Sequence, residues 1–308
     1  MFEIVKHDVN IDFIRLRKYA AVLSAGVILA GIVSLVAHGG PNYGIDFTGG
    51  LMLHIGVDPD VKIGEVREAV SGLQVGDIQV QAFESEEGEF LLRVPEPDEQ
   101  VGGGTAELLK NRLREAFGAR GFEEKRTEIV GPRVGRDLRR RGILSVLFAT
   151  VVMGAYIAIR FDLRFGIGAA VALFHDVVVT VGALSLYNVE FDLTIVAGLM
   201  TVIGYSVNDT VVVSDRIREN MKLTKRYEFG SLINNSLNET LSRTLLTTGT
   251  TLLVLFALFV FGGGVIHGFA FTLIVGLTTG TYSSLFIASP IVELWAKQYD
   301  APRREGHD

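Results

Sequence analysis

Six long runs with almost no charged residues constrain the fold of this chain more than any other feature. Each run has about 18 residues or more, and at a rise of about 1.5 Å per residue a helix of that length crosses roughly 30 Å of hydrocarbon. Nearly half of the 308 residues are hydrophobic (48%), which is typical of polytopic membrane proteins. The predicted spans are 19–37, 142–159, 165–187, 193–215, 244–261 and 265–292.

The distribution of lysine and arginine predicts how these spans are oriented. The segments rich in them are 1–18, 216–243 and 293–308, and the connections 188–192 and 262–264 have none. Because the cytoplasmic flanks of membrane proteins carry the excess of positive charge, both termini are predicted to be cytoplasmic. The cluster Arg139 to Arg141 disagrees, since it precedes the second span on the predicted outer side.

The segment 38–141, between the first two spans, is soluble in character and predicts one α+β domain. Alternating apolar residues predict its strands, and apolar residues at helical spacing predict its helices. The expected elements are a strand at 51–57, a helix at 62–73, strands at 78–83 and 90–94, a helix at 105–117 and a strand at 122–130. This βαββαβ order is typical of a ferredoxin-like domain.

Three connecting segments carry expectations of their own. The polar run 84–88 is predicted to be a hairpin turn, and Gly102 to Gly104 a flexible lead into the second helix of the domain. The charged loop 216–243 is amphipathic, and it is expected to be either a helix on the membrane surface or a solvated connector.

Asp209 is a carboxylic acid inside the fourth predicted span. Ionising a carboxyl group in hydrocarbon is expensive, so an intramembrane acid indicates a functional site with a partner. Tyr205 shares its helix face, and Arg243 and Thr247 form a polar stripe at matching depth on the fifth span. An arginine within reach would hold the carboxylate ionised, and its withdrawal would let the acid take up a proton. The alternative is a static ion pair that fixes helix packing.

Other candidate residues are weaker. His175 and Asp176, near the middle of the third span, are either a relay group or a hydrogen-bonded contact between helices. Asp215 is expected to lie at the cytoplasmic interface. The chain has no cysteine, no zinc-binding His-Glu-x-x-His motif and no phosphate-binding lysine loop, so the sequence predicts no enzyme, no metal site and no cofactor. It also has no basic, aromatic-rich patch that would indicate nucleic acid.

Several motifs resemble one known family. The run from Gly204 to Asn220 closely resembles the fourth-span motif of SecF proteins, and the runs from Phe174 to Thr180 and from Leu241 to Thr244 fit the same family. A further motif, directly after the first span, is similar to the signature that opens the periplasmic domain of SecD and SecF proteins. Its residues are Gly44, Asp46, Phe47, Thr48, Gly49 and Gly50. The chain is thus identified as a member of the SecD/SecF family, within the resistance-nodulation-division superfamily.

The resemblance implies a subunit of the Sec protein-export machinery. It implies pairing with SecD, which supplies a second six-span half, and use of the proton-motive force to promote translocation of unfolded preprotein through the SecYEG channel. SecA and YajC are further candidate partners, and the implied location is the bacterial cytoplasmic (inner) membrane. The implied fold has six transmembrane helices and a periplasmic α+β domain between helices 1 and 2. The proton-handling residues of the family fall here on Asp209, Arg243 and Thr247.

Two other functions stay open at this point. One is a half-transporter for a proton-driven exporter of small molecules or lipids, although such pumps normally carry both halves in one much longer chain. The other is a non-transporting scaffold for the translocation channel, in which Asp209 and Arg243 are only structural.

Overall fold

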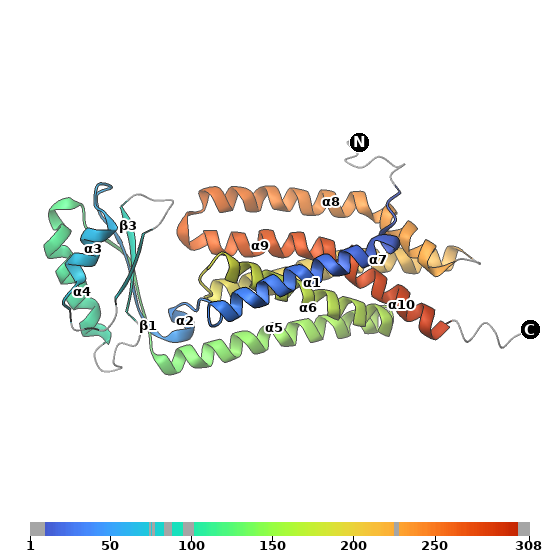
Figure 1. Ribbon diagram of the computed structural model, residues 1–308, viewed down its shortest axis with the longest axis horizontal. Coiled ribbons are helices and arrows are strands. Elements are labelled where there is room, and N and C mark those ends of the chain that lie inside the picture. The colour runs from blue at the N-terminus through green and yellow to red at the C-terminus, as the bar shows by residue number, and fades with distance from the viewer. Residues whose placement is uncertain are drawn as a thin grey trace, which may run out of the picture.

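The structure, a computed structural model, describes residues 10–73, 75, 78–82, 88–94, 102–224 and 228–300. It consists of a bundle of long helices with a small α+β domain at one end (Figure 1). Helix α1 (Phe13–Ala37) begins, and helix α10 (Ser289–Asp300) ends, at the end of the bundle away from the domain. The two ends of the described chain therefore lie on the same side of the bundle.

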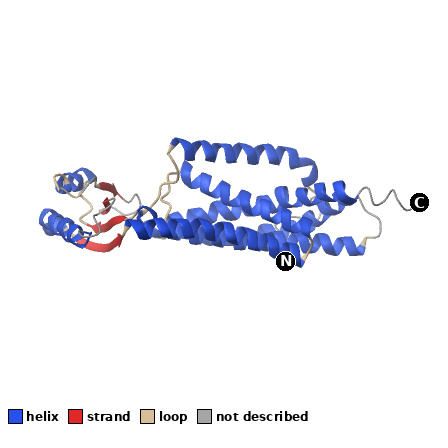
Figure 2. Ribbon diagram, turned by 90° about the horizontal axis from the view of Figure 1, so that it is seen from below, coloured by secondary structure: helices blue, strands red, loops and turns tan. Residues whose placement is uncertain are grey.

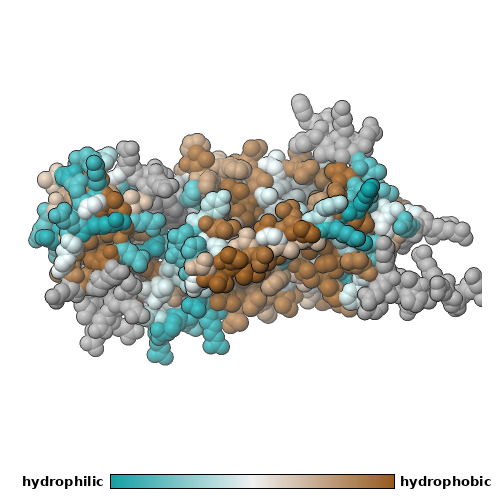
Figure 3. All heavy atoms as spheres, in the orientation of Figure 1, coloured by the Kyte–Doolittle hydropathy of each residue, from teal (hydrophilic) through white to brown (hydrophobic). Residues whose placement is uncertain are grey.

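Six helices of the described chain are long and apolar enough to cross a membrane. They are α1, α5 (Pro132–Arg160), α6 (Leu163–Leu186), α7 (Leu193–Leu223), α8 (Phe229–Phe261) and a last one made of α9 (Gly263–Ser283), a π-helical turn (Ser284–Ala288) and α10. Figure 3 shows a broad hydrophobic surface over the bundle with hydrophilic regions toward both ends. This belt is the surface expected for a protein embedded in hydrocarbon, and it agrees with the six predicted spans.

The helices are longer than the predicted spans. Helix α5 begins at Pro132 instead of residue 142, so Arg139 to Arg141 lie within a helix that runs toward the α+β domain. Helices α7 and α8 continue through most of the predicted loop 216–243, where Arg216 Nε donates to Glu239 Oε2 at 2.6 Å. This region is thus a pair of packed helix ends, and neither the surface helix nor the solvated connector describes it.

Small residues bring the bundle helices close together. A Cβ atom built on Gly31 of α1 would lie 2.8 Å from the Cα atom of Gly182 on α6, and one built on Gly276 of α9 would lie 2.1 Å from a methyl group of Val202 on α7. Close approach of backbones is a main source of van der Waals contact between membrane helices, because lipid removes the hydrophobic driving force. Both crossings depend on glycine.

The α+β domain contains the predicted elements in the predicted order. The strands are β1 (Gly50–Gly56), β2 (Gln79–Ala82), β3 (Glu89–Val94) and β4 (Glu123–Val130), and the helices are α2 (Ile45–Thr48), α3 (Ile63–Val70) and α4 (Gly102–Phe117), which is followed by a 3-10 turn (Gly118–Arg120). The sheet order is β2-β3-β1-β4, antiparallel throughout. The ferredoxin-like assignment stays a prediction. Gly102 to Gly104 belong to α4, so the flexible lead is wrong. Residues 84–87 of the predicted hairpin turn 84–88 lie outside the described residues.

The two faces of the sheet have different roles. Helices α3 and α4 cover the face turned away from the bundle (Figures 1 and 2), where Leu51, Leu53 and Leu92 are fully buried. On the opposite face of the sheet, Glu89 is buried, and its Oε2 atom lies 2.8 Å from His54 Nε2, within range of a hydrogen bond or ion pair. Alternation of side chains along the strands produces this division.

Candidate functional site

Asp209 lies on α7, in the interior of the bundle, with 2% of its surface exposed. Its Oδ2 atom accepts a hydrogen bond from Thr281 Oγ1 of α9 at 3.3 Å, and Thr281 Oγ1 lies 2.9 Å from Thr248 Oγ1 of α8. A buried carboxyl group in a membrane helix needs such polar neighbours. Three helices therefore meet at this acid, and two of its neighbours are threonines that the sequence analysis did not single out.

Arg243 and Thr247 lie on an exposed part of α8. Thr247 Oγ1 donates to the Arg243 backbone oxygen at 2.6 Å, one helical turn earlier. Within the described chain, no hydrogen bond or ion pair shorter than 4 Å joins the side chains of Arg243 and Asp209. The static ion pair that the sequence left open as an alternative is thus not formed in this structure. The alternation of Asp209 between an arginine-paired and a protonated state stays a prediction.

Polar side chains form an exposed face on α7 and α8. Tyr205 Oη lies 3.3 Å from Thr251 Oγ1 and joins the two helices. The exposed polar residues of this α7–α8 face are Thr201, Asn208, Asp215, Arg243, Thr247 and Thr250. Polar and charged groups at membrane depth are costly to leave against lipid and normally face protein or water. Thr201, Thr247 and Thr250 donate to backbone oxygens of their own helices, so Asn208 and Arg243 are the groups of this face least suited to lipid contact.

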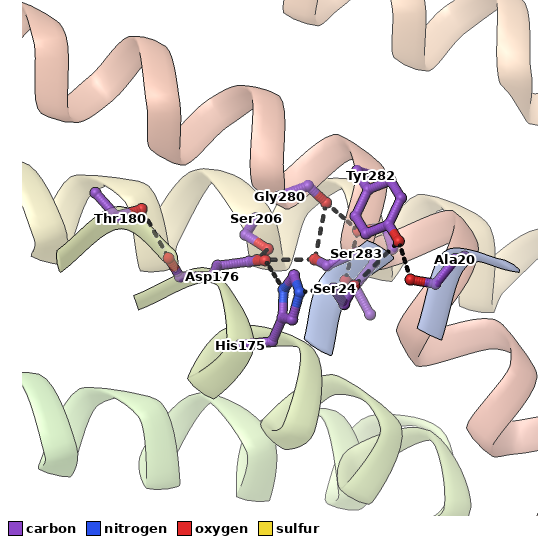
Figure 4. Close-up of polar contacts among 11 residues, drawn as sticks. Ala20, Ser24, His175, Asp176, Thr180, Ser206, Gly280, Tyr282 and Ser283 are labelled. Atoms are coloured by element: carbon purple, nitrogen blue, oxygen red, sulfur yellow. Dashed lines mark hydrogen bonds and ion pairs between the residues drawn. The ribbon is translucent and has the colours of Figure 1, made fainter. Parts of the chain in front are cut away.

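His175 and Asp176 of α6 form a second buried polar cluster (Figure 4). Asp176 Oδ2 accepts hydrogen bonds from Ser206 Oγ of α7 at 2.7 Å and from Ser283 Oγ of α9 at 2.8 Å. His175 Nε2 lies 3.1 Å from Ser24 Oγ of α1. The cluster joins four helices, so it has the interhelical contacts that one of the two sequence interpretations required.

The sixth span supplies most of the partners that sequence reasoning missed. Its run from Thr278 to Ser284 carries several hydroxyl groups in an otherwise apolar helix, and this run provides Thr281, Tyr282 and Ser283. This run of hydroxyl residues was the feature of the sequence that could have identified the sixth span as the source of partners for Asp209 and Asp176. It ends at the π-helical turn Ser284–Ala288, a form that is rare and is often found at functional sites.

The glycine-rich signature after the first span forms the joint between domain and bundle. Asp46 Oδ2 accepts a hydrogen bond from the Leu193 backbone nitrogen, at the start of α7, at 2.9 Å. The rings of Phe47 and Phe191 lie 6.0 Å apart. Gly49 has φ +79°, and a Cβ atom there would lie 2.7 Å from Pro132 at the start of α5. Glycine is therefore required at this position for both conformation and space.

Other residues of this signature hold the same joint. Thr48 Oγ1 donates to the Gly44 backbone oxygen at 3.1 Å, and the Gly44 nitrogen donates to the Phe191 oxygen at 2.9 Å. The second glycine of the motif, Gly50, begins β1 with φ +140°. An ion pair between Arg93 of β3 and Glu190 adds a link from the sheet to the connection between α6 and α7. The signature residues thus lie together at a structural junction, away from Asp209.

Comparison with known proteins identifies the family. Residues 110–298 match the family described as protein export membrane protein SecD/SecF, C-terminal, and residues 34–61 match the SecD/SecF GG motif. The chain is 44% identical to protein translocase subunit SecF of Desulfurispirillum indicum, with 95% of this chain and 94% of that protein covered. It is 47% identical to the same subunit of Magnetococcus marinus, with 92% of each chain covered.

A solved structure shows the same architecture. The crystal structure of SecDF, a translocon-associated membrane protein from Thermus thermophilus, superimposes with a TM-score of 0.84 at 33% sequence identity. The match covers 96% of this chain but 40% of that one, so this chain spans less than half of the SecDF polypeptide. The two sequence relatives are SecF translocase subunits. The family model, these relatives and the solved structure together show that the chain belongs to the SecD/SecF family of protein export membrane proteins.

Proposed function

We propose that this chain is the SecF half of a proton-driven complex that promotes preprotein export, with SecD as the other half. The observation that carries the proposal is the buried carboxyl group of Asp209 beside the exposed polar α7–α8 face. A six-helix half with this face in lipid would leave Asn208 and Arg243 without suitable surroundings. A second half packed on the face would cover these groups and enclose a path to Asp209. The SecDF polypeptide, of which this chain matches 40%, supports such a pairing.

In this proposal Asp209 alternates between a protonated state and a state in which Arg243 neutralises it. The position of Arg243 on the neighbouring helix α8, at the exposed α7–α8 face, supports this role. Thr247, one turn along α8, lines the same path. The domain joint at the start of α5 and α7 then transmits helix movement to the α+β domain, which meets the emerging preprotein.

The proposed setting is the bacterial cytoplasmic (inner) membrane, with both termini in the cytoplasm and the α+β domain in the periplasm. The location of lysine and arginine in the sequence supports this orientation. The proposed partners beyond SecD are the SecYEG channel, with SecA and YajC as associated components. Unfolded preprotein is the substrate.

The substitution Asp209→Asn tests the proposal in the complex assembled with SecD and SecYEG. The variant keeps the shape of the side chain and removes its ability to ionise, so gradient-driven export is expected to be lost while the complex still assembles. Export of a preprotein into membrane vesicles, with and without a proton gradient, measures the effect. Asp137→Asn is the matched control, because Asp137 is an exposed acid on α5, outside the α7–α8 face. Normal gradient-driven export by Asp209→Asn would favour a scaffold instead.

A further inference from the structure

Asp176 and His175 are a buried pair that the proposed function does not use. Asp176 has 1% of its surface exposed, and its Oδ2 atom is occupied by two serine hydroxyl groups, from Ser206 and Ser283 (Figure 4). Its Oδ1 atom lies 3.1 Å from Nδ1 of His175. The positions of hydrogens between these two atoms follow from the bonds that surround the pair.

A chain of hydrogen bonds fixes the proton on the far side of the imidazole ring. Tyr282 Oη donates to the Ala20 backbone oxygen of α1 at 2.7 Å. A tyrosine hydroxyl has one proton, so Ser24 is the donor in its 3.0 Å bond to Tyr282. The Ser24 hydroxyl is then used as well, so His175 Nε2 is the donor in its 3.1 Å bond to Ser24. Nε2 of His175 therefore carries a proton.

This assignment requires a second proton between histidine and aspartate. A neutral ring with its proton on Nε2 has a bare Nδ1, which would face an ionised Asp176 oxygen across 3.1 Å with no hydrogen between them. A proton held there removes the conflict, either as a carboxylic acid bonded to neutral His175 or as an imidazolium bonded to a carboxylate. In both forms the pair has no net charge, which is the favourable condition at membrane depth.

We propose that His175 and Asp176 form a proton-binding site whose occupancy sets the direction of the hydrogen-bond chain to α1. When the shared proton leaves, the neutral ring keeps one proton, on Nδ1, and donates it to the Asp176 carboxylate. Nε2 then accepts from Ser24, Ser24 accepts from Tyr282, and the Tyr282 hydroxyl turns away from the Ala20 oxygen. One proton is released, and one contact between α9 and α1 is lost. This proposal is independent of the role proposed for Asp209.

The charged residues on the neighbouring helices are bonded to groups other than His175 and Asp176, or lie far along their helices. Asp209 of α7 is bonded to Thr281, and Arg17 of α1 forms an ion pair with Glu293 of α10. The charged residues of α5 lie near its two ends, and the π-helical turn has none. Among the described residues, the further titratable side chain that contacts the pair is Tyr282, whose ring stacks on His175 with centroids 6.1 Å apart.

Nitrogen-15 NMR of the full chain in lipid bilayers tests the proposal directly. The His175 signals are assigned by their loss in His175→Gln. At neutral pH the expected spectrum has a protonated Nε2, and raising the pH is expected to move the proton of the neutral ring to Nδ1 in a single step. Asp176→Asn should abolish this switch. A ring with bare Nε2 at every pH, or a switch that persists in Asp176→Asn, would overturn the proposal.

Two further variants separate this site from its neighbours. Tyr282→Phe removes the hydroxyl that anchors the chain to Ala20, so the preference for a proton on Nε2 should be lost while the ring stacking stays. Ser206→Ala, the matched control, removes a bond to Asp176 without touching the chain, and the preference should remain. Asp209→Asn should leave the His175 spectrum unchanged whether or not Asp209 carries protons for export. An unchanged spectrum in Tyr282→Phe would contradict the proposed chain.

Discussion

At the scale of single residues, the two intramembrane acids differ in their surroundings. Asp176 is enclosed by hydroxyl groups and a histidine, whereas Asp209 is bonded through one threonine and lies beside the exposed α7–α8 face. The sequence identifies both acids because charge inside an apolar run is conspicuous. It did not predict Thr281 or Ser283, since these partners come from the sixth span, and only tertiary packing brings that helix beside the fourth.

In the α+β domain, the carboxylate of Glu65 makes bonds whose contribution to stability depends on pH. Glu65 of α3 accepts from the Lys62 backbone nitrogen at 3.0 Å and from Arg120 at 2.7 Å. These bonds, the first above all, lower the pKa of Glu65 below its usual value. The stabilisation is therefore fully present above the unfolded-state pKa, about 4.3, and is lost as the pH falls through the lower folded-state pKa.

Glu65→Gln is expected to weaken the protection of α3 backbone amides against hydrogen exchange at pH 7, because the charged acceptor is gone. The difference from the unaltered protein should shrink below about pH 4 and vanish once Glu65 is protonated in the folded state. Hydrogen exchange followed by mass spectrometry, corrected for the intrinsic rate at each pH, measures this. Glu68→Gln on the same helix serves as the control, and an equal effect from that variant would argue against the Glu65 site.

At the scale of elements, the sequence predicts which segments form helices and strands but not where the long helices end. Apolar runs mark the part of a helix that lies in hydrocarbon. Helices α5 and α7 continue beyond it through charged residues with good helix propensity. The first turns of α8 are rich in Gly, Ser and Asn, which have low propensity, and buried Leu232, Ile233 and Leu237 hold them against the bundle. The π-helical turn at Ser284–Ala288 has no sequence signature of its own, so the sequence predicts a single span there.

The close packing of α1 on α6 can be tested with two glycine substitutions on α1, one at the helix crossing and one away from it. Gly31→Leu puts a side chain against the backbone of Gly182, so it should destabilise the crossing of α1 and α6 by about 1–3 kcal/mol or displace α1. Gly26→Leu on the same helix should have little effect, because a Cβ atom there meets nothing within 4 Å. Thermal unfolding of the purified chain in detergent measures the difference. Equal stability of the two variants would contradict the packing described here.

At the scale of the whole molecule, the helix bundle with its exposed α7–α8 face is joined to the α+β domain by several short contacts. Asp46 and Phe47 connect the domain to the start of α7, and Gly49 brings it against the start of α5. These contacts are the route by which the proposed helix movement would reach the domain. The glycine-rich motif signals this joint in the sequence, but its contacts with residues about 140 positions later depend on the folded arrangement.

The central claim is that Asp209 carries protons only when a second six-helix half covers the α7–α8 face. Proton flux across vesicles, followed with an internal pH-sensitive dye after a pH jump, tests it most directly. Flux is expected in vesicles that contain this chain together with SecD, and it should fall to the background of empty vesicles for this chain alone and for the complex with Asp209→Asn. Undiminished flux through the Asp209→Asn complex would contradict the account.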